Sequence, residues 1–101
     1  MHYLLIYELA DDYFERRTQY RNDHLKLAWE ANANGALILG GALQNRTDTA
    51  ILFFKGDDDS VVKKFVDNDP YVLNGLIKKW SVRPWVTVVG DLADTPIKID
   101  E

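Results

Sequence analysis

The sequence contains no cysteine, only two histidines and a single methionine. Without cysteine the chain cannot form a disulfide, a thiolate nucleophile or a sulfur-ligated metal centre, and this composition fits a reducing compartment. The two histidines, His2 and His24, do not have the spacing of a metal-ligand pair. Phosphate-binding loops, dinucleotide-binding glycine motifs and nucleophile elbows are also absent from the sequence. We therefore expect a protein that uses no metal and no cofactor.

A long apolar run and a strong excess of one charge are missing as well. The 12 basic and 16 acidic residues give a net charge of −4, and the basic residues are scattered along the chain. Nucleic acid and anionic membrane are poor partners for such a protein. No run has transmembrane length, and the first apolar segment lacks the basic start and cleavage site of a signal peptide. These features predict a cytoplasmic protein.

The length of the chain, residues 1–101, predicts one domain, because a core of this size cannot be divided between two. The apolar fraction of 47% and the charged fraction of 28% are typical of a globular protein. Hydrophobic periodicity then predicts the elements along the chain. Strands are expected at 2–8, 36–43, 49–55 and 80–89, helices at 12–34 and from 57 to about 68, and a turn of helix or an ordered loop at 71–77.

Glycine and proline add detail to two of the predicted strands. Gly40 and Gly41 lie inside the second strand, where glycine usually indicates a bulge or a close backbone approach. Pro84 lies inside the last strand and cannot donate a ladder hydrogen bond. The last strand is therefore expected to lie at an edge of the sheet or to be locally broken.

The order strand, helix, strand, strand, helix, strand predicts an α+β fold of the ferredoxin-like βαββαβ type, with a four-stranded antiparallel sheet and two helices on one face. The other face would meet water, yet both alternating sets of residues in the first and third strands are apolar. Large exposed apolar surfaces are rare on monomers, and two-fold dimers are the commonest oligomers. We therefore expect a homodimer that forms through this sheet face.

The first predicted helix carries one face with alternating spacings of four and three, made of Tyr13, Arg17, Tyr20, His24, Leu27, Ala28 and Ala31. Burying a histidine there costs more desolvation than burying leucine or alanine. One interpretation is a core or interface histidine, and the other is a neutral imidazole that faces a pocket and moves protons near neutral pH. Arg21 and Arg17 lie toward the same side of the helix. They could bind an anionic ligand or extend their charged groups into solvent, and the second interpretation is favoured for Arg17.

Asp69 follows the second predicted helix, at an end where the macrodipole opposes a carboxylate. One interpretation is that Asp69 and Pro70 open a turn, with the side chain bonded to the following backbone. The other is that the carboxylate orients an imidazole, as in the histidine-orienting half of a catalytic triad. The fold is compatible with a pair between Asp69 and His24, because both segments can border the same end of the sheet.

The chain resembles the YCII-related (YciI-like) family in four segments, which are Arg21–Leu25, Gly35–Gly41, Asp67–Val72 followed by Gly75, and Ser81–Trp85. The resemblance spans nearly the whole chain and implies a dimeric α+β barrel. It also implies that His24 and Asp69 occupy the positions of the family's proposed His–Asp dyad, with Arg21 and Tyr71 near the pocket. Gly41 is taken as a further pocket residue, although Ala42 follows it where the family often has proline.

Relatives on this fold include small-molecule lyases, isomerases and monooxygenases, so the resemblance implies a site more than a reaction. Our first hypothesis is a metal-free enzyme of lyase or isomerase type that moves protons on a small aromatic or lactone-like substrate. His24 would be the acid or base, Asp69 would set its tautomer, and Arg21 with Tyr71 would hold polar substrate groups. The alternative is a non-catalytic module that binds a small metabolite or acts in a stress response. A pure dimerisation scaffold is disfavoured by the polar residues on a buried helix face.

Overall fold

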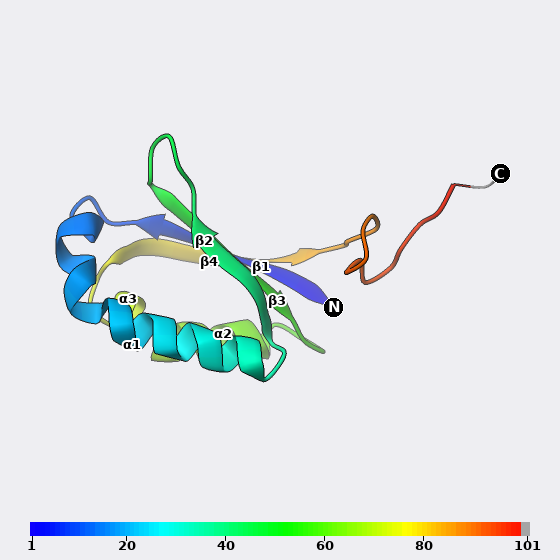
Figure 1. Ribbon diagram of the computed structural model, residues 1–101, viewed down its shortest axis with the longest axis horizontal. Helices are drawn as coiled ribbons and strands as arrows, with labels where there is room; N and C mark the ends of the chain where they lie inside the picture. The colour runs from blue at the N-terminus through cyan, green and yellow to red at the C-terminus, as the bar shows by residue number, and fades with distance from the viewer. Residues whose placement is uncertain (100–101) are drawn as a thin grey trace.

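A computed structural model describes residues 1–99 of the chain (Figure 1). Four strands and three helices follow one another in a βαββααβ order. Their bounds are β1 (His2–Leu9), α1 (Tyr13–Ala33), β2 (Leu37–Ala42), β3 (Thr49–Lys55), α2 (Ser60–Asn68), α3 (Pro70–Leu73) and β4 (Ile77–Trp85). The short α3 is the predicted turn of helix, and it extends the βαββαβ plan without changing it.

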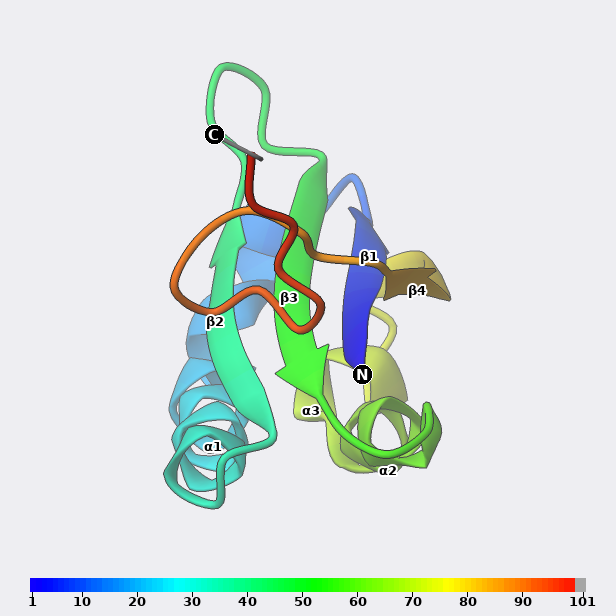
Figure 2. The same ribbon diagram turned by 90° about the vertical axis from the view of Figure 1, so that its right-hand side faces the viewer.

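The strands form one antiparallel sheet in the order β2-β3-β1-β4. All three helices lie on the same face of this sheet (Figures 1 and 2). The predicted ferredoxin-like α+β fold is therefore confirmed, and β4 with Pro84 is an edge strand as expected.

The core lies between the sheet and the helices because alternate residues of the two central strands point that way. Tyr3, Leu5 and Tyr7 of β1 are at most 4% exposed. Leu52 and Phe54 of β3 join them from the neighbouring strand. The short helix α2 closes this core with three buried residues spaced on one face, which are Val62, Phe65 and Val66.

Helix α1 covers the sheet less tightly. Its first residue, Tyr13, is buried, whereas the other members of the predicted helix face are half-buried. The helix ends at Ala33, and Gly35 adopts a φ of 88°, which glycine reaches without the strain of a side chain. The incomplete burial reflects a cavity between α1 and the sheet, described below.

Several details differ from the sequence prediction. Helix α2 begins at Ser60, after the N-cap residue Asp59, and so starts three residues later than expected. The register shift in β2 lies between Leu37 and Leu39, so the bulge precedes the two glycines instead of including them. The last strand begins at Ile77, three residues early, because that residue pairs with Leu9 across the sheet. It also ends early, at Trp85, because Trp85 pairs with His2, the first residue of β1, and the residues after it have no partner strand on that side.

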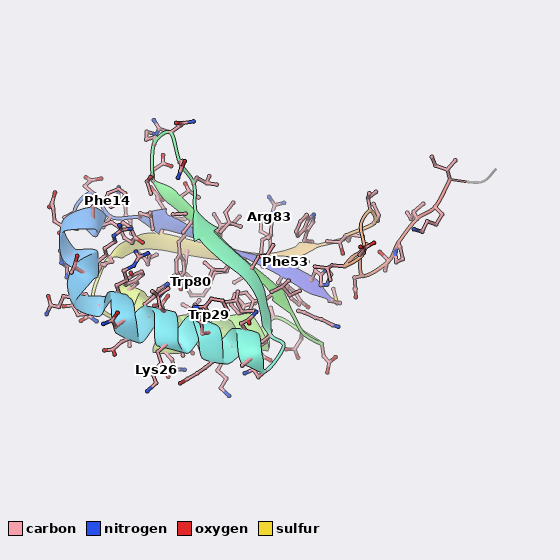
Figure 3. The ribbon with its side chains drawn as sticks, in the orientation of Figure 1. Phe14, Lys26, Trp29, Phe53, Trp80 and Arg83 are labelled. Carbon is pink, nitrogen blue, oxygen red and sulfur yellow. The ribbon has the colours of Figure 1, made fainter. Side chains whose placement is uncertain are left out.

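The sheet face away from the helices is apolar and partly exposed. Leu4, Ile6, Ile51 and Phe53 lie on it and are half-buried, and Figure 3 shows Phe53 on this side. Within residues 1–99 no helix covers this face (Figures 1 and 2). Residues 86–99, here called the C-terminal arm, extend from the end of β4 away from the helices (Figure 1). Their apolar side chains are largely exposed, namely Val86, Val89, Leu92, Ile97 and Ile99.

Candidate functional site

Asp69 lies at the junction of α2 and α3, and its side chain is completely buried. An extended ψ of 116° at this residue ends α2, as expected for a residue that precedes proline. Oδ1 then accepts a hydrogen bond from the backbone N–H of Tyr71 at 3.0 Å, which caps α3. The turn-forming interpretation of Asp69 is therefore correct, but it describes part of what this carboxylate does.

The same carboxylate binds two side chains from other elements. Nδ1 of His24, on α1, lies 2.7 Å from Oδ1. The hydroxyl of Tyr7, on β1, donates to Oδ2 at 2.7 Å. Asp69 thus joins the sheet to two helices, and an ionised carboxylate is the natural acceptor for all three donors.

Aromatic contacts fix the orientation of the His24 ring, in addition to the contact between Nδ1 and Asp69. This ring stacks on the ring of Tyr71, with centroids 3.9 Å apart and planes 10° apart. The edge of Phe65 approaches from another side, at 6.4 Å between centroids. Since Nδ1 donates to Asp69, the lone pair of a neutral imidazole is on Nε2, which has no hydrogen-bond partner within residues 1–99. The ring can therefore take a proton at Nε2 while Asp69 stabilises the charge that results.

A cavity of about 380 Å³ opens beside this imidazole, between α1 and the strands. The volume is in the range of small-molecule sites. The predicted site residues His24, Arg21, Tyr71 and Gly41 all line the cavity, whereas Asp69 does not and acts from behind His24. The structure brings these residues together, and their catalytic and binding roles remain predictions.

Two tyrosines and an arginine at the site were not recognised as site residues from the sequence. Tyr7 and Tyr13 line the cavity, although their positions predict only core packing. Arg17, expected to extend into solvent, also lines the cavity, and its guanidinium carbon lies 4.8 Å from the ring centroid of Phe14. A buried tyrosine needs a partner for its hydroxyl, and that requirement was the available signal for Tyr7.

The pKa values of two site tyrosines are raised. Burial, and then the nearby charge of Asp69, raise the pKa of Tyr7 far above its ordinary value. Burial, and then Tyr13, raise the pKa of Tyr71 to about 12, although Arg21 and Arg17 act in the opposite direction. Both hydroxyls are therefore protonated donors at neutral pH.

Residues 1–99 contain no group of three or more His, Asp or Glu side chains placed to hold a metal ion. Within the same range, none of the helices has the length and apolar character needed to cross a membrane.

Comparisons with known proteins show the family and the fold of the chain. The YCII-related domain matches residues 1–86, so the C-terminal arm lies almost wholly outside the matched region. The solved structure of 5-chloro-2-hydroxyhydroquinone dehydrochlorinase from Burkholderia phenoliruptrix AC1100, in complex with 2,5-dihydroxybenzoquinone, superposes with a TM-score of 0.75. The two sequences are 20% identical over 93% of this chain and 100% of that one, a likeness that shows the fold. No curated protein matches the sequence.

Proposed function

Because the chain belongs to the YCII-related domain family, we propose that it is a small-molecule enzyme whose His24–Asp69 pair catalyses proton transfer. The observation that supports this proposal is the 2.7 Å contact between Nδ1 of His24 and a fully buried carboxylate, beside a cavity. In this arrangement Nδ1 of His24 is hydrogen-bonded to Asp69, and Nε2 is available to a ligand. A histidine that only packs in a core would not need both features.

The proposed reaction is of lyase or isomerase type. Nε2 of His24 takes a proton from a carbon of the substrate, and Asp69 stabilises the imidazolium. In an isomerisation the same proton is returned to another atom of the substrate. In an elimination it stays on His24 while the leaving group departs with the bonding electrons, and is later released to water. General acid–base catalysis of this kind contributes about 10²- to 10⁴-fold in rate.

The cavity supports a small, oxygenated ring compound as the substrate. Arg21 and Tyr71 offer polar contacts, and apolar residues such as Leu37 and Leu52 line the rest. The similar dehydrochlorinase binds 2,5-dihydroxybenzoquinone, a planar oxygenated ring. We extend this substrate class to the present chain as part of the proposal, and we retain the proposed cytoplasmic location.

A second copy of the chain is the proposed cover of the exposed sheet face. The apolar face around Phe53 continues into Trp85, with the two rings 5.2 Å apart and Trp85 46% exposed. The C-terminal arm extends this apolar surface beyond the edge of the sheet. A face-to-face homodimer would bury both regions and leave the α1 cavity accessible, because the cavity lies on the helix side.

Ligand screening followed by product analysis tests the function. Thermal shift of the protein with a panel of hydroxyquinones, lactones and acidic phenols identifies binders. Each binder is then incubated with the protein and with His24→Gln, and the products are analysed. The proposal expects at least one compound to be converted by the native protein and not by the variant. Equal conversion by the variant would overturn it, and binding without conversion would favour the non-catalytic alternative.

A further inference from the structure

The hydroxyl of Tyr71 is a buried donor without an acceptor. The side chain is 3% exposed and lines the cavity, yet within residues 1–99 its oxygen has no hydrogen-bond partner. Tyr13 lies nearby, with ring centroids 5.6 Å apart, and its hydroxyl is close enough to raise the pKa of Tyr71. The distance and angle between the two hydroxyls nevertheless fall outside those of a hydrogen bond. Leaving a buried donor unsatisfied costs free energy, so such groups in native proteins usually have a missing partner. A ligand atom in the cavity is the natural acceptor.

Two guanidinium groups line the same cavity without a protein counterion. Arg17 and Arg21 lie one turn apart on α1, and neither forms an ion pair with a carboxylate of residues 1–99. The neighbouring Arg16 differs, because it pairs with Asp12 and donates to the carbonyl oxygen of Asn74. Arg17 is placed by aromatic rings instead, above Phe14. The two free charges act on the Tyr71 hydroxyl, whose pKa they lower against the effect of burial.

Among residues 1–99, no Asp or Glu side chain lines the cavity to neutralise these arginines. Asp69 is occupied by its three donors and lies behind His24. The cavity therefore combines an excess of positive charge and an unused hydroxyl donor with apolar walls that include Leu25, Ala28 and Leu52. Walls of this kind suit a ring, and the charged side suits an oxygen that carries a full negative charge.

We infer that the cavity binds its ligand as an anion, a small planar ring with an ionised oxygen, such as an acidic phenol or enol. The oxygen would accept from the Tyr71 hydroxyl and face Arg21 and Arg17, while the ring lies against the apolar walls. This inference rests on the proposed function for the use of the cavity as a ligand site, but not on the chemistry of His24. In this inference, Tyr71, Arg17 and Arg21 make the cavity bind the ionised form of the ligand more tightly than the neutral form.

The probe for this inference is 4-nitrophenol, because its anion and its neutral form have different absorption spectra. The native protein should bind the anion about tenfold more tightly than the neutral form, which lowers the ionisation midpoint of the bound probe by about one pH unit. Arg21→Gln and Tyr71→Phe should each reduce this preference by about three- to tenfold. Circular dichroism of each variant verifies that it is folded.

Lys26→Gln is the matched control, since it removes one positive charge from the same helix. Lys26 is not a cavity residue, and it projects from α1 on the side away from the sheet (Figure 3). The inference requires Lys26→Gln to leave the midpoint of the bound probe unchanged. It would be overturned by an unshifted midpoint in the native protein, by equal effects of Lys26→Gln and Arg21→Gln, or by failure of the probe to bind. The midpoint of the bound probe reports binding alone, and turnover is measured separately with a convertible compound, so loss of turnover and loss of anion selectivity are separate results.

Discussion

Nδ1 of His24 lies 2.7 Å from Oδ1 of Asp69, and this carboxylate is fully buried with two further donors. The acid is thus satisfied by the protein before any ligand binds. Its hydrogen bond holds the proton of a neutral His24 on Nδ1, and the stacked ring of Tyr71 fixes the plane. The nitrogen that remains available has one orientation, which is the condition for efficient proton transfer.

Asp69→Asn keeps the size of the side chain and removes the charge and one acceptor oxygen, so it tests the orienting role of the carboxylate. Asparagine offers one acceptor oxygen in place of two, so it cannot serve both Tyr7 and His24. We expect kcat to fall by about 10²- to 10⁴-fold in an assay with the converted compound. The double variant with His24→Gln should be no slower than His24→Gln alone, because groups that act as a unit are not additive. If the fall in kcat of the double variant equalled the product of the two single falls, His24 and Asp69 would not act as one unit.

Tyr7 should contribute to stability through its bond to Asp69. Tyr7→Phe removes the hydroxyl and leaves Oδ2 buried without that donor, so we expect the free energy of unfolding to fall by about 1–3 kcal/mol in urea titrations. Tyr3→Phe is the control from the same strand, because the Tyr3 hydroxyl donates to Sδ of Met1, a weak acceptor. Equal losses in the two variants would show that the Tyr7–Asp69 bond has no special effect.

Alkaline pH should destabilise the fold through Tyr71. Its pKa is about 12 in the folded chain, against about 10 in an unfolded one. Between these values the folded state keeps a proton that the unfolded state has lost, so the free energy of unfolding falls as the pH rises through this window. Denaturant titrations at several pH values should show a shallower decline for Tyr71→Phe. An equally steep decline in that variant would assign the effect to other groups.

Assembly can be tested on the exposed sheet face. Phe53→Asp places a charge at the centre of the proposed interface, and it should convert a dimer into a monomer in sedimentation at micromolar concentration. Leu73→Asp is the control, since Leu73 is 67% exposed on α3, on the helix side of the sheet. A native protein that sediments as a monomer would contradict the proposed homodimer.

The fold was predictable because local patterns agreed with one another. The apolar character of β1 and β3, and the end of α2 before Asp69 and Pro70, follow from short-range propensity and burial. The start of β4 was not predictable in the same way, because Lys78 and Lys79 conceal the strand, and its pairing with Leu9 is a long-range property. Its end at Trp85 is also a long-range property, because it is set by His2, the first residue of the partner strand β1.

The site was predictable only in part. His24 and Asp69 were unusual at their positions, but the sequence could not show that the carboxylate caps α3 and holds His24 at the same time. Tyr7 resembles any other aromatic residue in a buried strand until the fold places it opposite Asp69. The cavity beneath α1 is a consequence of how far the helix packs from the sheet, and hydrophobic periodicity carries no such information.

Proton exchange with solvent is the most direct test of the central proposal. A compound bound in the cavity is incubated in deuterium oxide with the native protein, with His24→Gln and with Lys26→Gln, and deuterium at its carbon atoms is followed by NMR. The proposed role of His24 predicts incorporation at one position with the native protein and with Lys26→Gln, and a rate about 10²- to 10⁴-fold lower with His24→Gln. Incorporation at an equal rate in His24→Gln would contradict it.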